Sequence, residues 1–167
     1  MHCDQLAKIT KQETHLCLVE DATGNQLTYQ IIGAAMAVHN QLGAGYKEEV
    51  YEKALFVELS QRGMTAQRQH PVTVEHSGEV VGIFYLDLWV GEGVVVEVKA
   101  LSHQLTNDEL AQVINYLKAS GASVGLLFNF GRRRLEYRRI FPPKSSGEVQ
   151  RVGRDRVERP STDTDRE

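Results

Sequence analysis

Five consecutive residues, Val94-Val95-Val96-Glu97-Val98, place the strongest constraint on how this chain can fold. Four of them are β-branched valines, and a nearly continuous run of this kind is typical of a strand buried on both faces. Glu97 stands inside the run, although an ionised carboxylate is seldom buried without a partner because its desolvation is costly. The sequence therefore predicts a buried strand whose one charged residue is there for a reason other than folding.

Helical and strand patterns alternate around this run. Apolar residues recur at helical spacing over 28–42 and over about 48–62, and glycines follow both segments. A hairpin is predicted over about 72–89, with its turn at 76–79. A helix capped by Thr106 or Asn107 and ended by Gly121 comes after the valine run, followed by strands at 124–130 and 135–141. This order of elements predicts one α/β sheet domain. In the first two helices the apolar residues on one side are Ile31, Ile32, Ala35, Met36, Val38 and Leu42, then Val50, Ala54, Leu55 and Leu59.

Length and composition agree with a single domain. The chain has 167 residues, 41% of them hydrophobic, so it can bury one core but is too short for two ordinary domains. Residues 1–26 show no sustained period and are interpreted as a peripheral segment, although 15–19 could form a short strand or helical turn. Residues 143–167 have balanced charge and few large apolar side chains, which predicts a disordered tail. The domain is placed at residues 27–142.

Charge and cysteine content exclude several classes of protein. The formal net charge is -3 and the pI is about 6.1, so no global positive field attracts nucleic acid or an anionic membrane, and any nucleic-acid contact comes from a local patch. Cys3 and Cys17 argue against a disulfide framework and against a zinc or iron–sulfur site. The amino terminus lacks an apolar leader, and no stretch approaches the roughly 18 apolar residues of a membrane helix. We expect a cytoplasmic protein with no membrane association.

Three charged residues are predicted to converge near the valine run. Asp87 lies near the end of the second hairpin strand, and Glu97 and Lys99, two residues apart, share one face of the next strand. If these strands are neighbours, the cluster can bind a hard divalent ion through oxygen, as Mg²⁺ or Mn²⁺ prefers. Such an ion lowers the pKa of a bound water and neutralises phosphodiester charge, while Lys99 can hold the attacking water or stabilise the transition state. The alternative is that Glu-x-Lys forms only a solvated face or a cross-strand ion pair.

A second motif gives the cluster a family resemblance. Residues 45–51, Gly-Tyr-Lys-Glu-Glu-Val-Tyr, match the pattern Gly-x-x-Glu-x-x-Tyr. On six stretches, one of which contains this motif, the chain resembles the GxxExxY protein family, which is placed in the PD-(D/E)xK nuclease superfamily; the resemblance covers roughly residues 27–141. The stretches are Tyr29–Ala35, Gly43–Leu55, Tyr85–Leu88, Val96–Ala100, Gln112–Leu117 and Leu126–Gly131.

The resemblance implies a fold and a set of roles. The fold is a restriction-endonuclease-like αβββαβ core, a mixed central sheet flanked by helices. Asp87 and Glu97 would be metal ligands with the Val98 carbonyl, Lys99 the catalytic lysine, and Glu48 a helix carboxylate that assists metal binding. Relatives often have proline at the position of Ala44, which does not touch the cluster.

Residues of the next helix extend the resemblance. Gln112 and Tyr116 are similar to the final motif of the RecB-like and exonuclease branch, where it orients the nucleic-acid strand. One helical turn separates these two side chains, so they share a face of the helix.

Several other residues carry open alternatives. Arg132, Arg133 and Arg134, followed by Arg138 and Arg139, form a basic segment that either contacts phosphate groups or protects the edge of a terminal strand from aggregation. For Tyr51 the alternatives are a packing residue whose hydroxyl finds one polar partner, which we predict, and a catalytic acid. His39 either lines the site or is a satisfied, half-buried histidine.

Three functions follow from these residues. The leading hypothesis is hydrolysis of phosphodiester bonds in DNA that depends on Mg²⁺ or Mn²⁺. The second is a non-catalytic module that keeps the fold and binds nucleic acid or a protein. The third is a subunit whose DNA-positioning surface comes from another chain, either a second copy or a partner protein. No Walker loop and no serine or cysteine nucleophile elbow is present, so nucleotide-driven and covalent mechanisms are not expected.

Overall fold

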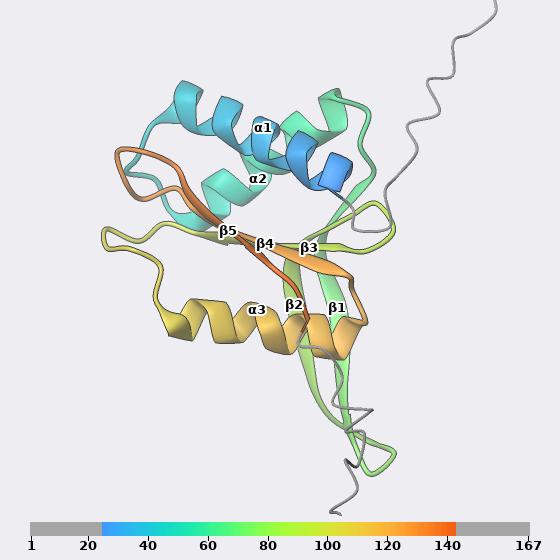
Figure 1. Cartoon of the computed structure of the whole chain (residues 1–167). Helices are drawn as coiled ribbons and strands as arrows, with labels where there is room; N and C mark the ends of the chain where they lie inside the picture. The colour runs from blue at the N-terminus through green and yellow to red at the C-terminus, as the bar shows by residue number, and fades with distance from the viewer. Residues whose placement is uncertain (1–24, 143–167) are drawn as a thin grey trace, which may run out of the picture.

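The computed structural model describes residues 25–142, which form a mixed five-stranded sheet with helices on both faces (Figure 1). This arrangement confirms the predicted α/β fold. No helix in the described range is long and apolar enough to span a bilayer. The predicted terminal segments, Cys3 and Cys17 lie outside the described residues, except that Asn25 and Gln26 begin the first helix. The elements are α1 Asn25–Leu42, α2 Glu48–Gln61, β1 Ala66–His76, β2 Glu79–Val90, β3 Val94–Lys99, α3 Asn107–Ser120, β4 Val124–Asn129 and β5 Glu136–Ile140.

β3 is the middle strand of the sheet, whose order β1-β2-β3-β4-β5 follows the chain. It pairs antiparallel with β2 and parallel with β4, and α3 makes the crossover that a parallel pair requires. α1 and α2 cover one face of the sheet, and α3 covers the other (Figure 1). Every residue of β3 except Lys99 is buried, which confirms the strand predicted from the valine run.

Consecutive residues of β3 belong to different core layers. Val96 and Val98 pack in the layer of α1 and α2, whereas Val95 packs with residues of α3. Strand alternation puts Glu97 and Lys99 on the same face as Val95, toward α3. Burying one such valine contributes about 1.5–3 kcal/mol, so both layers fix the strand that carries the charged pair.

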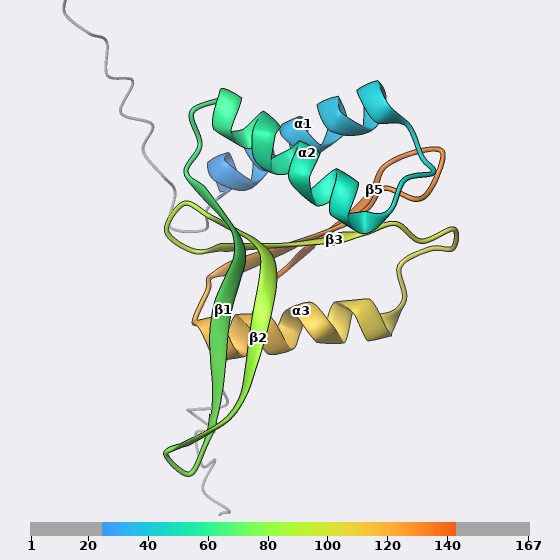
Figure 2. The same cartoon turned by 180° about the vertical axis from the view of Figure 1, so that it is seen from behind.

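The β1–β2 hairpin turns away from the rest of the sheet at Asp87. Leu88 packs in the layer of α1 and α2, but Leu86 packs in the layer of α3, so β2 changes the face it presents between these two residues. Gln69, the β1 residue opposite Asp87 by register, has a φ of 51°. This left-handed conformation costs a non-glycine residue about 1–2 kcal/mol and persists only where its surroundings enforce it. Beyond the turn, residues 70–86 run past α3 as a two-stranded arm (Figure 2).

The structure corrects parts of the helix pattern. Met36 and Val50, which share the apolar spacing of α1 and α2, are 43% and 40% exposed, so their predicted place on the apolar side is wrong. In α2 the buried face instead carries Glu52, which has polar partners described below. The cap of α3 is Thr106, whose side chain and the side chain of Glu109 form a capping box.

Candidate active site

Asp87, Glu97 and Lys99 come together at the end of the β2–β3 ladder. The last ladder pair before this point joins Leu88 to Val96, and Asp87 Oδ2 then accepts the backbone N–H of Val98 at 2.8 Å. Lys99 Nζ donates to Glu97 Oε1 at 2.8 Å. The convergence predicted from strand alternation is therefore present, and Asp87 takes the place of a ladder hydrogen bond.

Glu97 has an oxygen that nothing in residues 25–142 satisfies. Its side chain is 4% exposed, and Oε2 is buried without a hydrogen-bond partner. Burial, and then the negative charge of Asp87, raise the pKa of Glu97 to about 7, although the ion pair with Lys99 opposes the shift. An unpaired buried carboxylate oxygen is costly, so the site favours a proton or a cation beside Oε2.

Asp87 is perturbed in the same direction. Burial raises its pKa to about 6, although the N–H of Val98 opposes the shift, and the charge of Glu52 adds to it. Burial alone would lower the pKa of Lys99, but its hydrogen bond and ion pair with Glu97 raise that pKa instead. The site thus holds a charged ammonium beside two carboxyl groups that resist ionisation, a pattern found at functional sites.

The Gly-x-x-Glu-x-x-Tyr motif has a structural explanation in Tyr51. The Tyr51 hydroxyl donates to the Gly43 carbonyl at 2.6 Å and accepts the Tyr46 N–H at 3.2 Å. Its ring, fully buried, stacks on Phe130 with centroids 4.7 Å apart. Tyr51 therefore fixes the loop that leads into α2, which confirms the predicted packing role.

Glu48, the first residue of α2, is placed by that loop at the edge of the cluster. Its Oε1 accepts the N–H of Ala100, the residue after Lys99, at 3.3 Å. The side chain is exposed, and its charge acts on both Asp87 and Glu97.

Gln112 and Tyr116 face the cluster from α3. Gln112 Nε2 donates to the Tyr116 hydroxyl at 2.6 Å. Burial raises the pKa of Tyr116, and the charges of Glu97, Lys99 and Asp87 all act on its hydroxyl. The predicted pair therefore shares one helix face and lies within electrostatic reach of the three charged residues.

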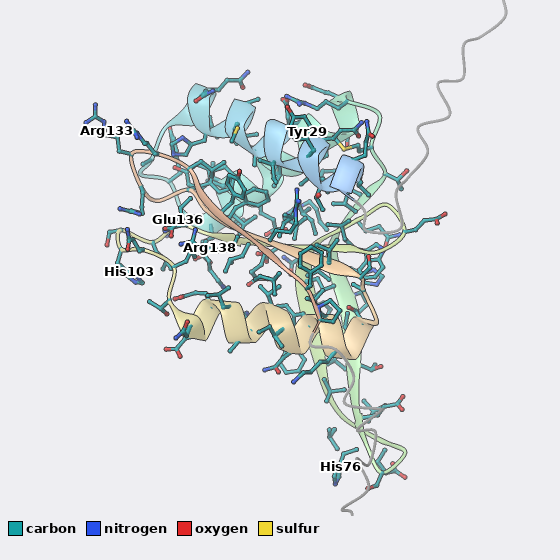
Figure 3. The ribbon with its side chains drawn as sticks, in the orientation of Figure 1. Tyr29, His76, His103, Arg133, Glu136 and Arg138 are labelled. Atoms are coloured by element: carbon teal, nitrogen blue, oxygen red, sulfur yellow. The ribbon has the colours of Figure 1, made fainter. Side chains whose placement is uncertain are left out.

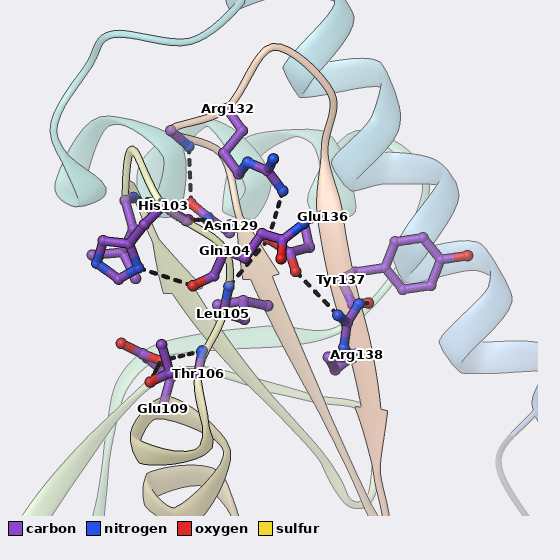
Figure 4. A network of polar contacts seen from close by, with 12 residues as sticks. His103, Gln104, Leu105, Thr106, Glu109, Asn129, Arg132, Glu136, Tyr137 and Arg138 are labelled. Atoms are coloured by element: carbon purple, nitrogen blue, oxygen red, sulfur yellow. Dashed lines mark hydrogen bonds and ion pairs between the residues drawn. The ribbon is translucent and has the colours of Figure 1, made fainter.

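The predicted basic segment divides into arginines paired with Glu136, which Figure 4 shows, and exposed arginines. Glu136, with a side chain 10% exposed, accepts from Arg132 at 3.4 Å and from Arg138 at 3.1 Å. Arg133 and Arg134 are exposed, and neither forms an ion pair with any residue in 25–142. These two cations lie on the β4–β5 loop, at the end of the sheet where β3 leaves it (Figure 1).

His39, on α1, contacts the same β4–β5 loop from the face of the sheet opposite α3. Its Nε2 lies 2.9 Å from the carbonyl oxygen of Arg132, to which it donates, and the ring is buried. The satisfied histidine, one of the two alternatives for this residue, is the one present.

Asn129 was not singled out by sequence reasoning, yet it ties the two loops at this end of the sheet (Figure 4). Its Oδ1 accepts the N–H groups of Leu101 and Gly131 at 2.9 and 3.1 Å, and its Nδ2 donates to the His103 carbonyl at 2.9 Å. A Cβ on Gly131 would lie 2.5 Å from backbone atoms of Ala100 and Leu101. A polar residue within the apolar run 124–130 was the available signal.

Glu52 is a second polar residue that sequence reasoning did not single out. It is buried on α2, and its Oε1 accepts from Arg68 Nε and from Gln69 Nε2, each at 3.0 Å. This contact holds the strained Gln69 opposite Asp87. A glutamate at helical spacing from the buried Leu55 and Leu59 was the signal.

The donor set agrees in kind with a hard divalent cation. Within the described range, no group of three or more His, Cys, Asp or Glu side chains is close enough to hold a metal ion, so the structure does not bring Glu48 together with Asp87 and Glu97 as a set of three carboxylate ligands. The carboxylates of Asp87 and Glu97 are oxygen ligands of the type that Mg²⁺ and Mn²⁺ prefer. Oε2 of Glu97 has no hydrogen-bond partner among the described residues and can therefore act as a ligand, so the chemistry of these residues fits such an ion.

Comparison with known proteins agrees with this fold. The family model of the PD-(D/E)XK nuclease superfamily matches residues 25–140. Searches of curated proteins and of solved structures found no match. The family match contains every element described above, from α1 to β5, and all the charged residues of the cluster. Because it spans well over half of the 167 residues, the chain belongs to the PD-(D/E)XK nuclease superfamily.

Proposed function

We propose that this chain is a divalent-metal-dependent nuclease that hydrolyses phosphodiester bonds in DNA. Members of its superfamily are generally nucleases. The observation that carries the proposal is Glu97, a buried carboxylate with one unsatisfied oxygen between Asp87 and Lys99. A purely structural ion pair gives no reason to leave that oxygen without a donor.

Asp87, Glu97 and the Val98 carbonyl would hold the ion, with Glu48 binding it directly or through water. Val98 directs its N–H to Asp87, on the β2 side, and the Lys99 carbonyl accepts from Phe130 on the β4 side. Since the N–H and C=O of one strand residue point to the same side, the Val98 carbonyl belongs to the β2 side. When bound, Mg²⁺ or Mn²⁺ would lower the pKa of a coordinated water and neutralise phosphate charge.

Lys99 supplies the positive charge of the protein itself. Its ammonium is held by Glu97 and remains protonated, so it can orient an attacking water or stabilise negative charge on the phosphate. Gln112 and Tyr116 would position the nucleic-acid strand from α3, the role that the RecB-like and exonuclease branch assigns to such a pair. The Gly-x-x-Glu-x-x-Tyr geometry supports membership of the GxxExxY family.

Arg133 and Arg134 would contact phosphate groups next to the site. The chain as a whole is negative, so affinity for DNA depends on such a local patch and weakens with added salt. Arg132 is already engaged by Glu136 and would act mainly by shaping the loop.

The test is cleavage of labelled single- and double-stranded DNA in Mg²⁺, Mn²⁺ or EDTA. Asp87→Asn and Lys99→Met should each lower the rate about a hundredfold or more, because each removes charge that acts on the transition state. The matched controls are Glu92→Gln and Lys53→Met, exposed residues outside the cluster that should cleave like the wild type.

The pattern of results separates the candidate functions. Metal-dependent cleavage lost in both variants supports the nuclease. Wild-type protein that binds DNA without cleaving it in either metal refutes catalysis by this chain alone and favours the binding module. Cleavage of RNA but not DNA would correct the substrate and keep the mechanism.

A further inference from the structure

The arm, residues 70–86, has an exposed apolar surface that no contact within the described chain covers. The tip of the arm lies beyond α3 and away from the β4–β5 loop, as the positions of the labelled His76 and Arg133 show (Figure 3). Successive residues of a strand point to opposite faces, so both faces of the arm are apolar and accessible. The exposed residues, each between 46% and 62% accessible, are Val80, Val81, Ile83, Phe84 and Tyr85.

The charge of this region favours a protein over nucleic acid as the partner. No lysine or arginine occurs from Gln69 to Val98, and the arm carries Glu75 and Glu79. Binding to nucleic acid draws on lysine and arginine contacts with phosphate. An apolar, acidic arm therefore fits a protein surface.

A groove beside the arm carries an acidic residue on one wall and a basic residue on the other. It has a volume of about 710 Å³ and lies between the arm and α3. Glu75 stands on the arm wall and Lys118 on the helix wall, and neither forms an ion pair with another residue of the described chain. Under a two-fold axis the same patch meets itself, so an acid on one wall and a base on the other become two opposite-charge pairs.

We propose that the arm and this groove form the interface of a homodimer, in which Glu75 pairs with the partner's Lys118 and Lys118 with the partner's Glu75. Five large side chains at about half exposure leave on the order of 500 Å² of apolar surface per copy. That is a large part of the roughly 800 Å² per partner that a stable interface buries. The inference stands apart from nuclease activity, because its test measures association.

The first test is the molar mass of the full chain by light scattering and by sedimentation over a range of concentrations. Wild type should be a dimer, and Val81→Glu, which places a charge on the arm, should be a monomer. Val57→Glu is the matched control, because Val57 is 50% exposed on α2, outside the arm and the groove, and this variant should stay dimeric.

The second test uses two charge reversals, Glu75→Lys and Lys118→Glu. Each alone creates two like-charge pairs across the axis and should raise the dimer Kd about tenfold, since each pair contributes up to about 1 kcal/mol. A mixture of the two variants makes every pair opposite again, so the mixed dimer should form with wild-type affinity. An ion pair within one copy cannot produce that rescue.

Three results would overturn the proposal. The first is a wild type that is monomeric at every concentration, and the second is a Val81→Glu variant that remains dimeric. The third is a mixture of the reversed variants that associates no better than either alone. Hydrogen exchange on a monomeric wild type would then identify the occupant: slow exchange of arm amides, lost on deleting residues 143–167 or gained on adding DNA, would assign the arm to the chain's own segment or to nucleic acid.

Discussion

Replacing Glu97 by glutamine should stabilise the protein above neutral pH. A carboxyl whose pKa rises from 4.5 to about 7 on folding binds its proton more tightly in the folded state, so wild-type stability falls as the pH rises from about 4.5 through about 7. At 1.36 kcal/mol per pKa unit the cost of the ionised form is on the order of 3 kcal/mol. Glutamine has the same shape and does not titrate.

The assay is urea denaturation of both proteins in EDTA from pH 5 to pH 8. The free energy of unfolding of Glu97→Gln minus that of the wild type should increase by on the order of 2–3 kcal/mol across this range. The low-pH value serves as the baseline, because protonated Glu97 also leaves Lys99 without a carboxylate. Glu92→Gln, in an exposed turn, should run parallel to the wild type. A constant difference for Glu97→Gln, or one that shrinks with pH, would refute the reasoning that burial makes this carboxylate costly.

Three more predictions follow from the site. Binding of Mg²⁺ or Mn²⁺ should tighten from pH 5.5 to pH 8 and release protons, because Asp87 and Glu97 have raised pKa values; calorimetry in buffers of different ionisation enthalpy measures the release, and pH-independent affinity would contradict it. Tyr51→Phe should lower the free energy of unfolding by about 0.5–1.5 kcal/mol in urea, since it removes the hydroxyl partner of a part-buried carbonyl and a part-buried N–H; an unchanged midpoint would show that water replaces the hydroxyl. Gly131→Ala should destabilise by about 1–3 kcal/mol through a backbone clash, whereas Gly82→Ala, whose Cβ would lie in ordinary contact 4.0 Å from Phe84 Cε2, should not, and equal midpoints would count against the packing at Gly131.

Residues that depend on local periodicity were predictable from the sequence. The valine run gave the central strand, and period-two alternation placed Glu97 and Lys99 on one face. The capping residue and the terminal glycine of α3 were also readable, because helix caps are chosen by local chemistry. The roles of Glu48, Gln112 and Tyr116 came from the family resemblance.

Residues that depend on long-range partners were not predictable. Glu52 is explained only by Arg68 and Gln69, which β1 brings beside α2 after the sheet has formed. Both partners are far from Glu52 in the sequence. A glutamate on the apolar side of a helix therefore indicates that a polar partner exists, but it does not identify that partner. Arg132 and Glu136 are only four residues apart, but their ion pair depends on how the β4–β5 loop folds back, which the sequence did not predict.

Met36 and Val50 show the limit of an apolar pattern. Helical spacing assigns a residue to a stripe, but the width of the buried face depends on what packs against it. These two side chains are exposed because the buried face of each helix is narrower than the stripe of apolar residues in its sequence.

The order of the strands has a consequence for how this molecule folds. Because β2 and β3 are a local antiparallel pair, Asp87, Glu97 and Lys99 can meet before the residues of α3 have been synthesised. Until α3 docks, one face of that pair is open to water, and both carboxylates keep their hydration. The cost of removing it therefore falls on the step in which α3 and the parallel partner β4 close over the strands. We expect that step to slow as the pH rises through the range in which the two carboxyl groups ionise, so that refolding kinetics would report on the same two groups that we propose as metal ligands.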